Sequence, residues 1–80
     1  MITPFQMRIA MAALNLNRTQ LAAKVGVNMQ TISAALEGKG INSKTMKAIE
    51  DVFEDAGLVV LNAGDARGDG IGIRFRDRAA

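Results

Sequence analysis

The 80-residue sequence contains no cysteine and no histidine. The lack of cysteine excludes a disulfide framework, and the lack of both excludes any metal site or nucleophilic dyad that depends on either residue. No segment approaches the roughly 20 consecutive apolar residues that a membrane-spanning helix needs, and the first residues lack the layout of a signal peptide. We therefore expect a cytoplasmic protein with no membrane segment, no bound metal and no cofactor.

Acidic residues are nearly absent from the first half of the chain. Glu37 is the single acidic residue among residues 1–48, whereas residues 49–66 carry several acidic residues and no basic one. The net charge is only +2, so the sequence is lopsided rather than strongly basic. The excess of positive charge favours a polyanion as the partner of the first half. Its basic residues are Arg8, Arg18, Lys24, Lys39, Lys44 and Lys47.

A first helix is predicted to begin at Pro4 and to run to about Leu14. Thr3 is its expected N-cap, Pro4 suits the first helical position, and Gln6 completes a capping box. The spacing of apolar residues places four of them on overlapping inward-facing rows, namely Phe5, Ile9, Ala12 and Ala13. Further apolar residues lie beside these rows, namely Met7, Ala10, Met11 and Leu14.

Residues 17–38, NRTQLAAKVGVNMQTISAALEG, are predicted to form two short helices joined by a tight turn. Asn17 with Gln20 forms a capping-box pattern for the first of them, and Asn28 is a second N-cap. Gly26 lies where a left-handed backbone lets the chain turn sharply, and Gly38 ends the second helix. Apolar residues at helical spacing give the two helices their buried sides, namely Leu21, Ala22, Val25, Ile32 and Ala35 or Leu36.

This order of small, apolar and capping residues resembles the helix-turn-helix of the phage repressor, Cro and XRE family of DNA-binding proteins. Leu21, Ala22, Gly26, Val27 and Ile32 all fall at the offsets of that motif. An ordinary helical hairpin with a glycine turn is the alternative, but it needs neither the alanine at position 22 nor the Gly-Val pair. The resemblance implies a mainly α, lambda-repressor-like bundle of about four helices, which acts as a sequence-specific transcriptional repressor.

The resemblance also implies that residues 28–37 form the recognition helix, whose outward side chains meet base edges in the major groove. Gln30 is the one good base reader, because its amide can make a bidentate contact with adenine, and the helix has no arginine for guanine. A polar face without a DNA role is the other reading, above all for Met29 and Ala34. The expected base-contacting residues are Asn28, Met29, Gln30, Ser33 and Ala34.

Contacts to the phosphates of double-stranded DNA are expected from donors at helix starts. The candidates are Arg18, Thr19, Lys39, Asn42, Ser43 and Lys44. Lys24 and Lys47 suit either phosphate contacts or solubility. One departure from the family pattern concerns an arginine of the first helix that often pairs with a glutamate near the end of the recognition helix. The matching residues here are Met11 and Leu36, so a hydrophobic contact is expected in place of the ion pair.

A fourth helix is predicted after the loop at residues 39–43, with Asn42 or Ser43 as its cap and Gly57 at its end. Its apolar stripe comprises Met46, Ile49, Val52, Phe53 and Ala56. Paired carboxylates for hydrolysis would have to come from the acidic residues of this helix, which are expected on its exposed side. We therefore expect no catalytic residue and no enzyme.

After Gly57 the apolar period changes from that of a helix to that of strands. Residues 58–61 are an apolar run, residues 71–76 alternate with period two, and the segment between them is turn material, so a β-hairpin or strand pair is predicted. We expect residues 1–57 to form the helix-turn-helix domain and residues 58–80 a C-terminal β element. The apolar face of the second strand either folds back on the fourth helix or forms a homodimer, which we favour. Its residues are Ile71, Ile73 and Phe75.

A rival function comes from the same C-terminal segment. Strands with free edges can add to the sheet of another protein, as peptides do in β-strand addition. The chain would then be an antitoxin-like or adaptor protein whose C-terminal strands bind a protein partner. The two functions are compatible with each other, because the helix-turn-helix half remains available for DNA.

Overall fold

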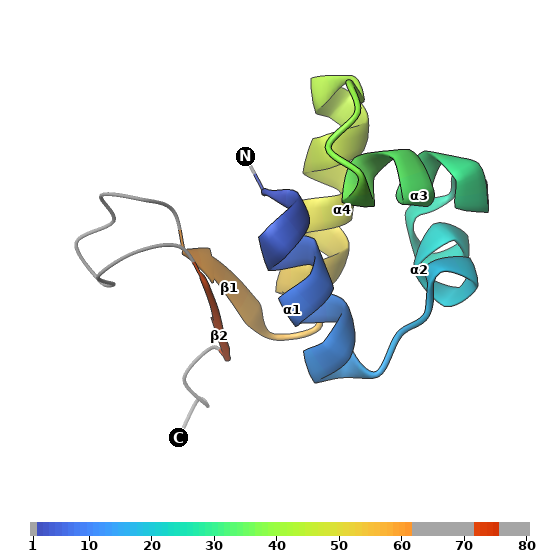
Figure 1. Ribbon diagram of the computed structural model, residues 1–80. Helices are drawn as coiled ribbons and strands as arrows, with labels where there is room; N and C mark the ends of the chain where they lie inside the picture. Colours follow the sequence, from blue (N-terminus) through green and yellow to red (C-terminus); the bar gives the residue numbers. More distant parts are fainter. Residues whose placement is uncertain (1, 62–71, 76–80) are drawn as a thin grey trace.

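The computed structural model describes residues 2–61 and 72–75, which form four helices and two strands (Figure 1). The helices are α1 (Pro4–Leu14), α2 (Arg18–Val25), α3 (Met29–Leu36) and α4 (Ser43–Asp55). The strands are β1 (Leu58–Leu61) and β2 (Gly72–Phe75). The mainly α bundle with a short C-terminal strand pair, predicted from the sequence, is therefore confirmed.

The helix starts are built as the sequence predicts. At α1 the hydroxyl of Thr3 accepts from the Gln6 amide at 3.1 Å, and the Gln6 side chain accepts from the Thr3 amide at 2.9 Å. Asn17 and Gln20 make the same reciprocal pair at α2, at 2.7 and 2.9 Å. These bonds satisfy amides that have no partner within the helix, which fixes where each helix begins. The later helices are each capped by one asparagine, Asn28 and Asn42.

The turn between α2 and α3 depends on Gly26. Its backbone adopts a left-handed conformation with φ of 87°. The amides of Gly26 and Val27 both donate to the carbonyl of Ala22, at 2.8 and 3.1 Å. The chain therefore leaves α2 abruptly, and only three residues separate the end of α2 from the start of α3.

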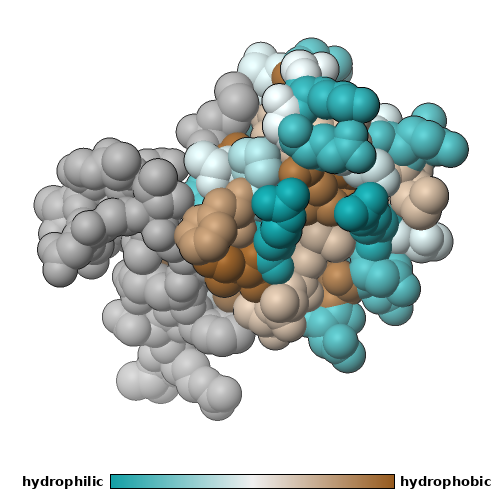
Figure 2. Space-filling model, viewed as in Figure 1, coloured by the Kyte–Doolittle hydropathy of each residue, from teal (hydrophilic) through white to brown (hydrophobic). Residues whose placement is uncertain are grey.

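The core lies where the four helices meet β1. Figure 2 shows hydrophilic side chains over the side formed by α2 and α3, while apolar side chains emerge around α1. Every helix and β1 contribute at least one side chain that is almost completely buried, so the five elements share one core. The largest of these are Phe53, Met7, Leu21, Ile32, Ile49 and Leu58.

The inward face of α1 differs from the sequence prediction. Phe5 is 58% exposed, and Ala12 and Ala13 are also exposed, so their placement on the inward rows was wrong. Ile9 is half-buried. The face that packs is the neighbouring one, with Gln6, Met7, Ala10 and Met11. Because α1 is apolar on most sides, the spacing of its apolar residues alone does not show which face is buried. The buried face even includes the polar side chain of Gln6.

β1 and β2 pair in an antiparallel register within one chain. Leu58 and Val60 of β1 are buried, and β1 packs against α4. Their register partners in β2 are Phe75 and Ile73, and β2 lies against α1. The strand pair thus folds back on the helices, but the second strand packs on α1 and not on the fourth helix as expected, because β1 occupies the place against α4. Ile71 and the expected turn segment lie outside the described residues, and the homodimer stays a prediction.

Candidate nucleic-acid interface

α3 has one buried side and one side that faces solvent. Ile32, Ala35 and Leu36 are buried in the core, which fixes how the helix is turned about its axis. Asn28 precedes it as the N-cap and accepts from the Thr31 amide at 2.9 Å. The expected base-contacting residues all lie on the accessible side: Asn28, Met29 and Gln30 are exposed, and Ser33 and Ala34 are partly exposed.

The start of α2 contacts that accessible side of α3. The Arg18 guanidinium donates from Nη1 to Oγ of Ser33 at 3.0 Å. One residue along, the Thr19 hydroxyl donates to the sulfur of Met29 at 3.7 Å. The structure therefore joins two expected phosphate-contacting residues to two expected base-contacting residues in one surface, which we call the α2–α3 surface.

A second group of expected phosphate-contacting residues lies at the start of α4 and in the loop before it. All four are exposed, namely Lys39, Asn42, Ser43 and Lys44. Lys39 forms an ion pair with Glu37 at 3.1 Å, but both side chains are more than half exposed, so the pair is weak. The Asn42 side chain accepts from the Thr45 amide at 2.8 Å and therefore serves as a cap.

Lys47 forms an ion pair within its own helix. Its ammonium donates to the Asp51 carboxylate at 2.8 Å, one turn further along α4. The hydrogen bond to Asp51 and the charge of that carboxylate raise the pKa of the Lys47 ammonium above its ordinary value. Of the two uses left open for Lys47, this pairing favours a surface charge over a phosphate contact.

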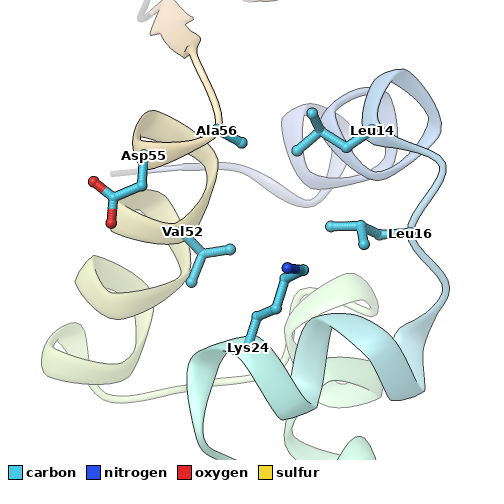
Figure 3. Close-up of a pocket in the computed structure, with 6 residues that line it drawn as sticks. All are labelled: Leu14, Leu16, Lys24, Val52, Asp55 and Ala56. Carbon is cyan, nitrogen blue, oxygen red and sulfur yellow. The ribbon is translucent and has the colours of Figure 1, made fainter.

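The cleft in Figure 3 shows where Lys24 lies. Its ammonium points into the cleft, whereas the Asp55 carboxylate points away from it. Lys24 follows Arg18 by six positions, which is a rotation of about 240° around a helix, so the two cations lie on different sides of α2. Lys24 is therefore separate from the α2–α3 surface. The cleft has a volume of about 510 Å³ and is lined by Leu14, Leu16, Lys24, Val52, Asp55 and Ala56.

Sequence reasoning missed a contact between α1 and the end of α3. Arg8 donates from Nη2 to the carbonyl oxygen of Leu36 at 2.8 Å. The last carbonyls of a helix accept no hydrogen bond from within that helix, and the carbonyl of Leu36 is one of them. A cation at this end also complements the helix dipole. The side chains of Met11 and Leu36 are both buried. Arg8 thus lies about one turn before Met11, the residue that matches the arginine of the family pattern, and it binds the backbone of Leu36 instead of a side chain.

Two features are absent from the described part of the chain. Residues 2–61 and 72–75 contain no group of three or more acidic, cysteine or histidine side chains that can hold a metal ion. None of the helices in those ranges has the length and apolar character needed to cross a membrane.

A family of known proteins matches the helical part of the chain. The model of a helix-turn-helix family, HTH_3, matches residues 7–54. That range runs from the first turns of α1 almost to the end of α4 and includes both helices of the α2–α3 surface. No curated protein matches the chain.

Proposed function

The chain belongs to the XRE and lambda-repressor type of helix-turn-helix proteins, and on that premise we propose that it is a sequence-specific repressor of transcription that reads DNA with α3. The family is one of DNA-binding transcription regulators and not one of enzymes. The single observation that carries the proposal is the exposure of Asn28, Met29 and Gln30 together at the start of α3. A repressor of this kind acts by occupying its operator, so tight binding is sufficient for function.

Base reading depends on the size and chemistry of α3. Its eight residues span about 12 Å along the axis, and the major groove is wide enough to admit a helix. Gln30 binds adenine through its amide, in the bidentate manner that the two groups allow. Met29, which is 43% exposed, and Ala34 contact thymine methyl groups, and Ser33 is adaptable to several bases.

Phosphate contacts position α3 from both sides. Thr19 lies at the start of α2, and Lys39, Ser43 and Lys44 lie at or before the start of α4, so donors flank the reading helix. Asn42 contributes chiefly by capping α4, which presents the first amides of that helix to an anion. Each phosphate that a cation neutralises makes binding more sensitive to salt.

A titration of labelled duplex DNA tests base reading. Gln30→Ala should weaken binding to an adenine-containing operator by roughly 5- to 150-fold and leave binding to unrelated duplexes unchanged. Lys24→Ala is the matched control, since its side chain points into the cleft of Figure 3. An equal loss on every duplex would show that Gln30 does not read a base, and no binding at low salt would refute DNA binding altogether.

We further propose that two copies act together as a homodimer through the C-terminal strands, including Ile71, Ile73 and Phe75. Within the described residues β2 pairs with β1 on one side only, so its other edge is open to strand addition. Two-fold operators suit two-fold dimers, since each subunit then reads one half-site. Sedimentation equilibrium at micromolar concentration should give twice the 8.5 kDa chain mass.

The same open edge favours the second candidate function, an antitoxin-like or adaptor protein with a protein partner on its C-terminal strands. A nuclease-treated pull-down separates the two. Recovery of a stoichiometric partner by the full chain, and its loss in Arg74→Pro, which removes a backbone donor from β2 and leaves the core residues of β1 in place, would support the second function. A monomer in sedimentation would overturn the homodimer without affecting DNA binding by α3.

A further inference from the structure

The accessible side of α3 lacks a cation. Residues 29–36 include no lysine and no arginine, so the helix itself offers no side chain of the kind that most often recognises guanine. Gln30 reads adenine, and its neighbours on the accessible side are small or apolar. A guanine in the operator therefore needs a reader from another element.

Arg18 is placed to supply that reader. Its guanidinium reaches from α2 to the accessible side of α3, where Nη1 donates to the Ser33 hydroxyl at 3.0 Å. A guanidinium has five N–H donors, so this bond leaves a pair of them free for a bidentate contact. Within residues 2–61 and 72–75 the ion pairs involve other cations, and the charge of Arg18 is not offset by a carboxylate.

The core, rather than the side chain alone, fixes this position. Leu21 and Ala22 of α2 and Ile32 and Ala35 of α3 are all buried, so the two helices are held in one arrangement. The contact between Thr19 and Met29 is a second link between the same two surfaces. The start of α2 is therefore held beside Ser33 by the packing of the free protein.

We propose that Arg18 is a specificity-determining residue that reads a guanine in the major groove, with Ser33 holding its guanidinium in place. The inference rests on the proposed function, in which α3 lies in that groove. This role differs from the phosphate contact that the sequence predicts for Arg18. Ser33 accepts from Arg18 through its oxygen, and its own hydroxyl proton remains available to a base or a phosphate.

The geometry also predicts where the guanine lies. Ser33 follows Gln30 by three positions, which is a rise of about 4.5 Å along the helix and hence little more than one base-pair step. The guanine read by Arg18 is therefore one or two base pairs from the adenine read by Gln30. Operators should contain both bases in each half-site.

Selection of bound duplexes from a random pool tests the proposal, with the full chain and four single variants. The wild type should enrich a guanine within two base pairs of an adenine. Arg18→Ala should lose the guanine preference, which is a change of roughly 5- to 150-fold at that position, and keep the adenine. Arg18→Gln should change the preferred base from guanine to adenine, since glutamine pairs with adenine. Ser33→Ala should weaken the guanine preference, and Lys24→Ala should leave both bases enriched.

Two results would overturn the proposal. If Arg18→Ala weakens binding to every duplex equally and lowers the salt slope by about 0.9, Arg18 is a phosphate contact. If the adenine and the guanine preferences both survive in Arg18→Ala and Arg18→Gln, another residue reads the guanine. If the wild type enriches no sequence at all, the proposed function itself fails. Circular dichroism of each variant shows that the helices are retained.

Discussion

Leu36 connects α3 to α1 in two ways. Its side chain is buried in the core with Met11, and its carbonyl accepts from Arg8 at 2.8 Å. A hydrophobic pair needs no desolvation of charge, whereas a buried ion pair does, so an apolar pair can hold the two helices together at lower cost. The hydrogen bond from Arg8 adds direction, because it is made to one atom at the end of α3.

Leu36→Glu tests this connection. The new carboxylate would stand in the apolar core in place of a buried side chain, and we expect a loss of about 3–5 kcal/mol in the free energy of unfolding. Adding Met11→Arg should restore part of that loss by supplying a charge partner at the matching position. Urea unfolding of the single and double variants measures both effects. A single variant as stable as the wild type would show that Leu36 does not pack as described.

A matched pair of substitutions tests which face of α1 is buried. Met7 is fully buried, so Met7→Ala should lower the free energy of unfolding by about 2–5 kcal/mol. Phe5 is 58% exposed, so Phe5→Ala should change that free energy by no more than about 0.5 kcal/mol, in spite of the larger side chain removed. Thermal or urea unfolding gives both values. A larger loss for Phe5→Ala than for Met7→Ala would instead indicate that Phe5 lies on the buried face of α1, as the sequence predicts.

The helices and their boundaries follow from local chemistry, which is why the sequence predicts them well. A cap such as Asn17 or Asn28 bonds to an amide three residues away, so its partner is visible in the sequence. The exposed positions of α3 follow likewise from its cap, Asn28, and from the helical spacing of its apolar residues. The contacts of Arg8 and Arg18 are different, because they join residues 28 and 15 positions apart. Their partners depend on how helices pack, and no local pattern reports that.

Gly26 governs the angle between α2 and α3, and its substitution tests the turn. With φ of 87°, an alanine there is strained even though nothing lies within 4 Å of its added carbon. We expect Gly26→Ala to cost about 1–2 kcal/mol of unfolding free energy. Gly40→Ala is the control, since that glycine also has open space around it but no left-handed backbone. Equal stability of the two variants in urea would contradict a role for the left-handed turn.

At the scale of the whole molecule, charge is divided between two regions. Arg18 contacts α3, and Lys39 and Lys44 lie between the end of α3 and the first turn of α4, while α4 carries acidic residues further along. Such a division orients the protein toward a polyanion, because the basic side is attracted and the acidic side is repelled. The net charge of +2 therefore understates the attraction of the basic half of the chain for a polyanion.

Two lysines of α4 should differ in how they affect binding. Lys44 is exposed at the start of the helix, and Lys44→Ala should reduce the slope of log affinity against log salt by about 0.9. Lys47 is paired with Asp51, and Lys47→Ala should leave the slope unchanged. Anisotropy titrations over a series of salt concentrations give both slopes. Equal changes would mean that the phosphate contacts extend further along α4 than we propose.

The most direct test of DNA reading by α3 is an equilibrium titration with two duplexes. One is the duplex that the wild-type chain enriches most from a random pool, and the other has the same base composition in scrambled order. At about physiological salt, we expect the enriched duplex to bind at least about 1,000-fold more tightly, as specific regulators do. Gln30→Ala should remove much of that difference. Equal affinity for the two duplexes, or no binding to either, would contradict DNA reading by α3.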